Sequence, residues 1–177
     1  DRKFCTFLNP QCPIPQEASA ISNITDEMVK DAPLFSEKVA DFTAFCDGDF
    51  VLIAHNNDNF DRPFLEEEFL RAGLKMPPWK FIDSLKWARK YRSDLPKHSL
   101  QFLREAYQIE ALSAHRALND VLVLHQVFSR MVDDLSFKEI VELLNQTREL
   151  TRMPFGKHQG KNLSEIPKDY VEWLNKS

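Results

Sequence analysis

The sequence predicts an α/β domain, in which short buried strands alternate with helices. Two short runs, FVLIA at residues 50–54 and WKFID at residues 79–83, are rich in aromatic and β-branched residues, and a helical pattern follows each. Runs of this length and composition are typical of strands in a sheet that is covered on both faces. With 177 residues, 43% of them hydrophobic, the chain can form one full domain with a sizeable core and a small appendage.

The residues before the first run predict one strand and two helices. Residues 3–8 alternate as in a strand, and the proline-rich residues 9–15 then break regular structure. Thr25 fits the cap of a short helix that Pro33 ends. A second helix follows and is closed by Gly48; its apolar stripe consists of Phe35, Val39, Phe42 and Phe45.

From residue 55 onward the pattern predicts a series of helices around the second strand. The first expected helix has roughly ten residues, begins close to Asp61 and is ended by Gly73. The others span residues 84–91, 100–107, 115–131 and 136–144. In the longest of them, the broad face expected to be buried consists of Leu118, Val121, Leu122, Leu124, His125 and Phe128. Residues 151–177 change character, with two glycines among lysines. We therefore expect a main domain at residues 1–133, a connecting helix at 134–150 and a small separate element at 151–177.

The charge and cysteine content exclude several functional classes. A net charge of −4 gives no basic field of the kind that coats long stretches of nucleic acid, although it allows a few phosphates to be held through metal ions. Cys5, Cys12 and Cys46 follow no zinc or redox spacing and are typical of a cytoplasmic protein with reduced thiols. No apolar run is long enough to span a bilayer, so no membrane association is expected.

Three side chains are the candidates for catalysis: Asp61, His115 and Asp120. Asp61 ends a polar stretch, HNNDNFD at residues 55–61, and is expected where a buried strand gives way to a helix. In open α/β sheets, ligands bind beyond the carboxyl ends of the strands. Carboxylates are hard ligands for Mg²⁺ or Mn²⁺, and a neutral imidazole can take a proton from an attacking water. His115 and Asp120 lie about 140° apart around a helix, so both face one site only if His115 precedes the helix or lies in its frayed first turn.

Each of these residues alone has an ordinary structural role. An aspartate at a helix start is more often a cap, and a histidine there is more often a surface or hydrogen-bonded group. The combination is more specific, because two spaced signatures occur in order. Asn56 precedes Phe60-Asp61 by three intervening residues, and His115 precedes Asp120 by four.

These motifs resemble those of the DEDDh 3′–5′ exonucleases, a family that includes the proofreading epsilon subunits of bacterial DNA polymerase III. The matching segments are VLIAHN at 51–56 leading to Phe60-Asp61, FIDSL at 81–85, KHSL at 97–100, and AHRAL at 114–118 with Asp120. The upstream segment ISNITDEMV at 21–29 is also similar. The resemblance covers residues 1–130.

The resemblance implies a ribonuclease H-like exonuclease fold, with a mixed sheet flanked by helices, plus a short C-terminal appendage. It implies that Asp61 and Asp120 are ligands of two divalent metal ions, Mg²⁺ or Mn²⁺, and that His115 is the general base. Asn56 is a candidate for holding the loop or the terminal nucleotide, and Phe60 is a candidate for contacting the substrate. The implied reaction hydrolyses phosphodiester bonds at the 3′ end of single-stranded DNA or RNA and releases 5′-mononucleotides, in proofreading or repair. The sequence leaves open the choice between DNA and RNA, a DNA polymerase partner and a homodimer.

The Asp-x-Glu pair that these enzymes carry on their first strand is absent from this sequence. Either residues upstream of Asp1 carry it, or this member has lost its metal site. The first explanation is favoured, because a fold of this class without its central strand leaves exposed sheet edges and half a core. The competing hypothesis is a non-catalytic nucleic-acid-binding or polymerase-docking module that keeps the fold.

Other polar residues are secondary candidates. His55 borders the predicted site and is expected to position backbone, His98 to form hydrogen bonds at a helix start, and His125 to be a satisfied core residue. The glycine and lysine pattern of residues 153–161 could make a phosphate-binding turn. The alternative is a folding or docking role for the two aromatics of the C-terminal segment. Four cations could follow a nucleic-acid backbone or form the solvated face of a helix: Lys86, Arg89, Lys90 and Arg92.

Overall fold

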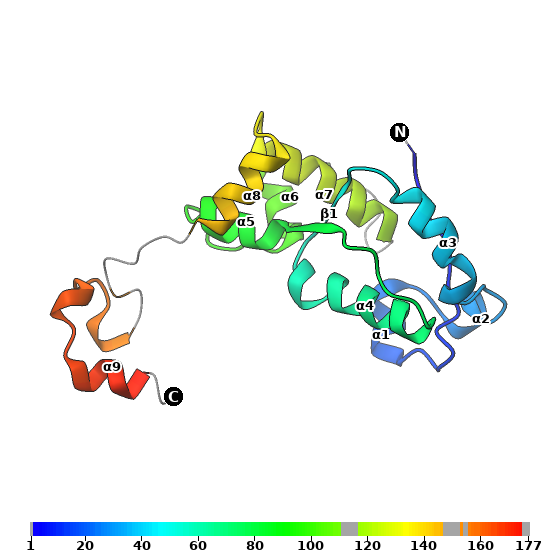
Figure 1. Cartoon of the computed structure of the whole chain (residues 1–177), viewed down its shortest axis with the longest axis horizontal. Coiled ribbons are helices and arrows are strands. Elements are labelled where there is room, and N and C mark those ends of the chain that lie inside the picture. Colours follow the sequence, from blue (N-terminus) through cyan, green and yellow to red (C-terminus); the bar gives the residue numbers. More distant parts are fainter. Residues whose placement is uncertain (1, 111–116, 147–152, 154–155, 175–177) are drawn as a thin grey trace. The chain divides into compact units, whose positions relative to one another are not determined.

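The structure, a computed structural model, describes residues 2–110, 117–146, 153 and 156–174. The chain divides into two compact units, Asp1–Leu144 and Asn145–Ser177. The elements of the first unit are, in order, α1 (Gln16–Ser22), α2 (Asp26–Val29), α3 (Phe35–Phe45), β1 (Val51–Ala54), the 3₁₀ helix η1 (Asn57–Asn59), α4 (Asp61–Arg71), β2 (Lys80–Asp83), α5 (Ser84–Tyr91), α6 (Leu100–Ala106), α7 (Ala117–Val132) and α8 (Phe137–Asn145) (Figure 1). The second unit contains η2 (Gly156–His158), η3 (Leu163–Glu165) and α9 (Lys168–Leu174).

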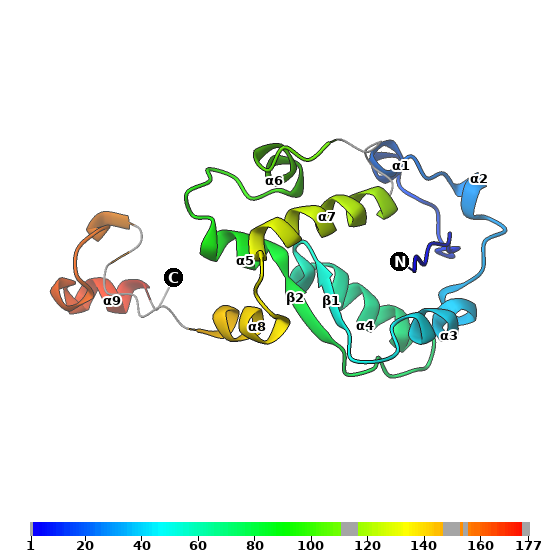
Figure 2. The ribbon, with the colours of Figure 1, turned by 90° about the horizontal axis from the view of Figure 1, so that it is seen from above.

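Two parallel strands form the sheet within the described residues. β1 pairs with β2 in a register that joins Val51 to Lys80 and Ala54 to Asp83 (Figure 2). The α/β class that the sequence predicts is confirmed. Because parallel strands end at the same edge of the sheet, the loop after β1 lies beside the start of α5. This edge contains the candidate site.

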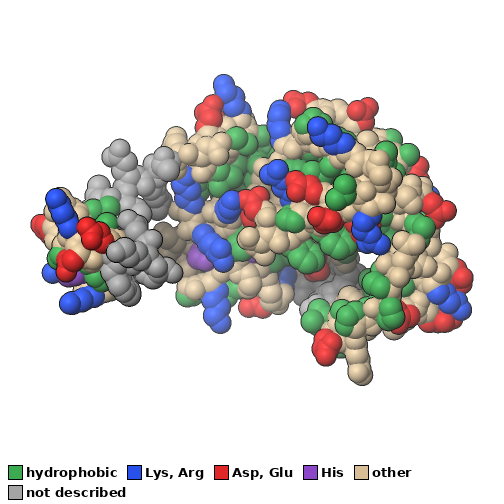
Figure 3. Space-filling view, turned by 60° about the horizontal axis from the view of Figure 1, so that its bottom comes forward, with side chains coloured by type: hydrophobic (Ala, Val, Ile, Leu, Met, Phe, Trp, Pro, Cys, Tyr) green, Lys and Arg blue, Asp and Glu red, His purple; other side chains and the backbone are tan. Residues whose placement is uncertain are grey.

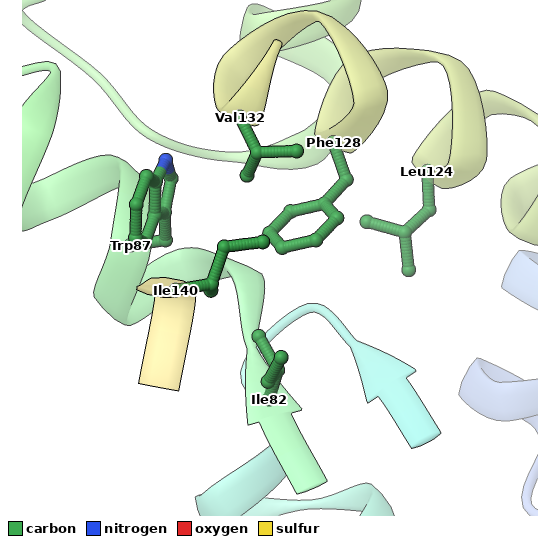
Figure 4. Packing of buried hydrophobic residues seen from close by; sticks show 6 residues of the cluster. All are labelled: Ile82, Trp87, Leu124, Phe128, Val132 and Ile140. Carbon is green, nitrogen blue, oxygen red and sulfur yellow. The ribbon is translucent and has the colours of Figure 1, made fainter. Parts of the chain in front are cut away.

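The main core lies between the sheet and the helices α5, α7 and α8. Its buried members are Ile82, Trp87, Leu124, Phe128, Val132 and Ile140 (Figure 4). A second cluster, formed by Ala88, Leu103, Ile109, Val123 and Val127, joins α5 and α6 to the other side of α7. Ile140 belongs to α8, so this helix packs into the first unit. The predicted division at residues 133 and 150 stays a prediction.

The buried face of α7 differs in two places from the predicted one. His125 is exposed and is therefore not the core residue that we expected. It lies 100° around the helix from Leu124, beyond the edge of the stripe that ends with Val132. Val121 is 57% exposed in the part of the chain that the structure describes. Helical periodicity places it on the apolar side, but the contacts that bury the stripe begin only at Val123.

The strand predicted at residues 3–8 is wrong, because these residues have no regular secondary structure. Phe4 instead packs against two rings of α3, with centroids 5.8 Å from Phe42 and 5.7 Å from Phe45. The alternating pattern of this segment thus serves contact with a helix. Helix α1 was not predicted, whereas the helices expected from Thr25 and after Pro33 are confirmed as α2 and α3.

Aromatic contacts join α3 and α4 to the approach of β2. The ring of Trp79, just before β2, lies edge-on to Phe42 of α3 at 5.6 Å and to Phe69 of α4 at 5.7 Å. Phe69 is 2% exposed and also contacts Phe35 at 5.4 Å. These contacts fix α4, whose first residue is Asp61, relative to the sheet.

The second unit is a small fold of its own. The backbone of Met153 donates to Lys161 and accepts from Gly160, both at 2.8 Å. Met153 and Ile166 are buried, and the ring of His158 lies edge-on to Tyr170 at 4.6 Å. Across both units, the described helices include none with the length and apolarity needed to cross a membrane.

Candidate functional site

The polar loop after β1 brings three of the predicted site residues together. Asn56 adopts a left-handed conformation with φ 72°, which asparagine tolerates better than most residues. Its side-chain oxygen accepts a hydrogen bond from the amide of Asn59 at 2.9 Å. Phe60 follows η1, and Asp61 is the first residue of α4, as the sequence predicts. Asn56, Phe60 and Asp61 therefore share one short turn at the carboxyl end of β1.

The buried carboxylate of Asp83, at the end of β2, holds this loop in place. It is 4% exposed and accepts four backbone N–H groups. One oxygen accepts from Asn56 at 3.0 Å and from Leu85 at 2.9 Å, and the other accepts from Asp58 at 3.3 Å. Asp83 thus caps α5 and fixes the loop at the same time. We missed this role, although an aspartate directly before a helix is a recognisable cap signal.

His55 forms a second bridge between the strand ends and a more distant segment. Its Nε2 donates to the carbonyl of His98 at 2.8 Å, since a carbonyl oxygen can only accept. Its Nδ1 lies 2.9 Å from the hydroxyl of the fully buried Ser84. That hydroxyl also lies 3.2 Å from the carbonyl of Ala54 and has one proton, which it donates either to this carbonyl or to a neutral His55. His98 in turn donates from Nε2 to the carbonyl of Arg92 at 2.9 Å. The positioning role predicted for His55 and the hydrogen-bonding role predicted for His98 are confirmed.

The environment of His55 favours the neutral ring. Burial lowers its pKa below the ordinary value of 6.5, and the charge of Arg89 acts in the same direction. The hydrogen bond to His98 and the charges of Asp83 and Asp61 oppose this shift in part. A neutral ring with its proton on Nε2 donates to His98, and its Nδ1 can accept from Ser84 when that hydroxyl points to the ring and not to the carbonyl of Ala54.

Asp61 is a half-buried carboxylate with no ion-pair partner among the described residues. Burial raises its pKa above the ordinary value, and the charge of Asp83 adds to this effect. A hydrogen bond to its own backbone and the charge of His55 lower the pKa in part. The ionised form of Asp61 is therefore compensated only in part, and a hard cation would stabilise it further.

Of the other two predicted catalytic residues, the structure describes only Asp120. Asp120 lies exposed in the first turn of α7. His115 lies outside the described residues. Among the residues that the structure describes, no three acidic, histidine or cysteine side chains gather closely enough to hold a metal ion. Asp61 and Asp120 are thus candidate members of a ligand set that the described residues do not complete.

Phe60 presents an exposed aromatic surface next to Asp61. Its side chain is 65% exposed and that of Phe64 is 59% exposed. The two rings stack with centroids 6.2 Å apart and an interplanar angle of 14°. An exposed aromatic surface beside a candidate catalytic carboxylate is suited to stacking against a nucleic-acid base.

Comparison with known proteins shows a family and a fold to which this chain is similar. A family model described as an exonuclease, RNase_T, matches residues 1–128. A solved structure of Exonuclease X in complex with 5′ overhanging duplex DNA is similar with a TM-score of 0.54 and 24% identity, over 77% of this chain and 78% of that one. The predicted ribonuclease H-like exonuclease fold is confirmed by these matches. A second model, described as "Putative quorum-sensing-regulated virulence factor", matches residues 139–177.

The curated relatives are much longer proteins. A PolC-type DNA polymerase III of Caldanaerobacter subterraneus subsp. tengcongensis is 36% identical over 132 residues, which is 75% of this chain and 9% of that protein. A PolC-type DNA polymerase III of Staphylococcus epidermidis is 30% identical over 149 residues, or 84% of this chain and 10% of that protein. This chain thus spans about a tenth of the length of the curated relatives that it matches.

Proposed function

Because this chain belongs to the RNase_T exonuclease family, we propose that it is a metal-dependent 3′–5′ exonuclease that acts on DNA and releases 5′-mononucleotides. The observation that carries the proposal is Asp61, a carboxylate that burial and Asp83 disfavour and that no described cation neutralises. It stands at the carboxyl end of a parallel strand, where α/β proteins bind ligands. DNA is the proposed substrate because the curated relatives are DNA polymerases and the solved neighbour was in complex with DNA.

Each residue of the candidate site has a proposed role in the reaction. Asp61 and Asp120 would hold two divalent ions, together with further carboxylates. Bound in such a site, the ions would activate a water for attack and stabilise the leaving 3′ oxygen. His115 is proposed as the general base that takes the proton of the attacking water. Asp83 and His55 would act by holding the loop that orients Asp61.

Recognition of the substrate end is assigned to the turn that contains Asp61. The stacked rings of Phe60 and Phe64 support stacking of a terminal base, and Asn56 supports the turn from within. A net charge of −4 fits an enzyme that engages a few terminal nucleotides. Association with a DNA polymerase is a further proposal, since the relatives carry the matching segment inside polymerase chains.

The test is metal-dependent release of nucleotides by the complete gene product. Single-stranded DNA and RNA oligonucleotides are incubated with Mg²⁺, Mn²⁺ or EDTA, and released 5′-mononucleotides are quantified by chromatography. We expect release from DNA with either metal and none in EDTA. Asp61→Asn and Asp120→Asn should each lower the rate by at least about 100-fold. Glu67→Gln, which neutralises an exposed carboxylate of α4, is the matched control and should retain the rate.

The competing function gives a different outcome. A non-catalytic nucleic-acid-binding or polymerase-docking module would bind the oligonucleotide and release no nucleotide with either metal. A metal-dependent release that Asp61→Asn and Asp120→Asn leave unchanged would place the chemistry elsewhere and contradict the assignment of this site.

A further inference from the structure

A pocket of about 550 Å³ lies beside the hydrogen bond that joins His55 to His98. Its lining includes both histidines, the cations Arg89 and Lys97, and the apolar residues Leu85 and Leu100. None of the described residues that line it is acidic. Its volume lies in the range of small-ligand sites and is large enough for a nucleotide unit.

The four cations around α5 have different partners in the structure. Lys86 pairs with Asp58, Lys90 donates to the carbonyls of Leu143 and Leu144, and Arg92 pairs with Asp94 and also donates to Tyr107. Arg89, by contrast, is exposed and makes no hydrogen bond or ion pair with any described residue. Only this member of the group lines the pocket.

Lys97 supplies a second uncompensated cation to the lining of the pocket. It lies in the connection between α5 and α6, is exposed, and likewise has no ion-pair partner among the described residues. Two unpaired cations without a lining carboxylate give the pocket a positive local field, although the chain as a whole is acidic. Figure 3 shows one face on which Lys and Arg side chains gather around a histidine.

The pocket lies near the candidate catalytic turn. Burial is the main cause of the lowered pKa of His55, but the charges of both Arg89 and Asp61 also act on this imidazole. Arg89 and Asp61 are therefore neighbours of the same ring. The pocket is lined by His55, the residue directly before the turn that leads to Asp61. A strand with its terminal phosphate at Asp61 would have further backbone phosphates toward its 5′ side, where the pocket could hold one.

From this arrangement we infer that Arg89 and Lys97 form a second phosphate subsite, which holds a backbone phosphate of the nucleic-acid strand on the 5′ side of the bond to be cleaved. This inference rests on the proposed function. The ligand is a phosphodiester within a single strand, and the pocket holds it by charge and by hydrogen bonds from the guanidinium and the ammonium group. Because no base edge is read, the subsite is independent of sequence.

The test is binding of a fluorescent single-stranded DNA oligonucleotide to the complete gene product without divalent metal, followed by anisotropy over a range of salt concentrations. Arg89→Ala/Lys97→Ala should weaken binding about tenfold at low salt. It should also reduce the slope of log K against log salt by about 0.7 for each phosphate contact that is lost. Lys75→Ala, which removes an exposed cation elsewhere in the first unit, is the matched control and should bind like the wild type.

A second series locates the phosphate. Oligonucleotides in which one phosphate at a time is replaced by an uncharged methylphosphonate should lose affinity for the wild type at one or two positions near the 3′ end. The double variant should show no loss at those positions. Equal losses in both proteins, or an unchanged affinity and salt slope in the double variant, would overturn the subsite and leave the proposed function standing. A wild type that binds no oligonucleotide would overturn both.

Discussion

The buried carboxylate of Asp83 accepts the backbone N–H of Asn56 at 3.0 Å, and this bond connects the ends of the two parallel strands. Its effect is to hold the turn that begins at Asn56 and leads to Asp61. The site therefore depends on a residue that is itself buried. Positioning of this kind matters because a small displacement of a catalytic group lowers the rate strongly.

Loss of the Asp83 carboxylate should unfold the loop and weaken the domain. Asp83→Ala leaves several buried N–H groups without an acceptor and removes the cap of α5, so we expect the free energy of unfolding to fall by about 2–4 kcal/mol. Asp83→Asn keeps one acceptor oxygen and should cause a smaller loss. Urea denaturation measures both changes. Asp49→Ala removes an exposed carboxylate and should have little effect; equal losses for Asp49→Ala and Asp83→Ala would contradict this role.

The stability of the domain should fall in mildly acidic solution because of His55. Burial places the pKa of His55 in the folded state below its ordinary value of 6.5. The unfolded chain therefore binds the proton more readily, and the free energy of unfolding decreases as the pH falls below 6.5, then levels off below the folded-state pKa. Denaturation at several pH values should show a weaker pH dependence for His55→Gln than for the wild type. Parallel pH curves would exclude His55 as a cause.

Asp61 should reduce stability in the absence of metal and increase it in the presence of metal. Burial raises the pKa of Asp61, so its contribution to stability at low pH is lost as the pH rises through the folded-state pKa. At neutral pH in EDTA, Asp61→Asn should therefore melt no lower than the wild type. Added Mg²⁺ or Mn²⁺ should raise the melting temperature of the wild type and of the control Glu67→Gln, but not that of Asp61→Asn. A metal-induced shift of equal size in Asp61→Asn would show that Asp61 is not a ligand.

Phe60 should contribute to binding more than to folding. Its ring is 65% exposed, so Phe60→Ala should change the free energy of unfolding little. If a terminal base stacks on the ring, the affinity for a single-stranded oligonucleotide should fall about tenfold, within the range found for base–aromatic stacking. Anisotropy measures the change. Phe137→Ala removes a ring that is 54% exposed on α8 and serves as control; an equal loss there would argue for a general effect of surface aromatics.

The sequence predicted well those features that depend on local pattern. Both strand runs, the start of α4 at Asp61 and the helix from Ser84 to Tyr91 are where the residues place them. These elements have short apolar runs or clear caps, which depend on neighbouring residues only. The prediction of a strand at residues 3–8 was wrong, because alternation alone does not distinguish a strand from an irregular segment that packs against a helix.

The candidate site could be predicted only in part, because its support comes from residues far apart in sequence. Periodicity gave no sign that Asp83 would hold the backbone of Asn56, or that His55 would bond to His98, 43 residues away. The same limit applies to the cations of α5, which look equivalent in sequence. They differ in the structure because Asp58, Asp94 and α8 provide partners for the other three cations. Arg89 has no such partner among the described residues and lines the pocket.

The most direct test of the central proposal follows a 5′-labelled single-stranded DNA oligonucleotide on a sequencing gel during incubation of the complete gene product with Mn²⁺. We predict a ladder of labelled products, each one nucleotide shorter than the one before. The ladder should require the metal and should be absent with Asp120→Ala. Immediate release of the label as a mononucleotide, or an oligonucleotide that is bound but keeps its length, would contradict a 3′–5′ exonuclease.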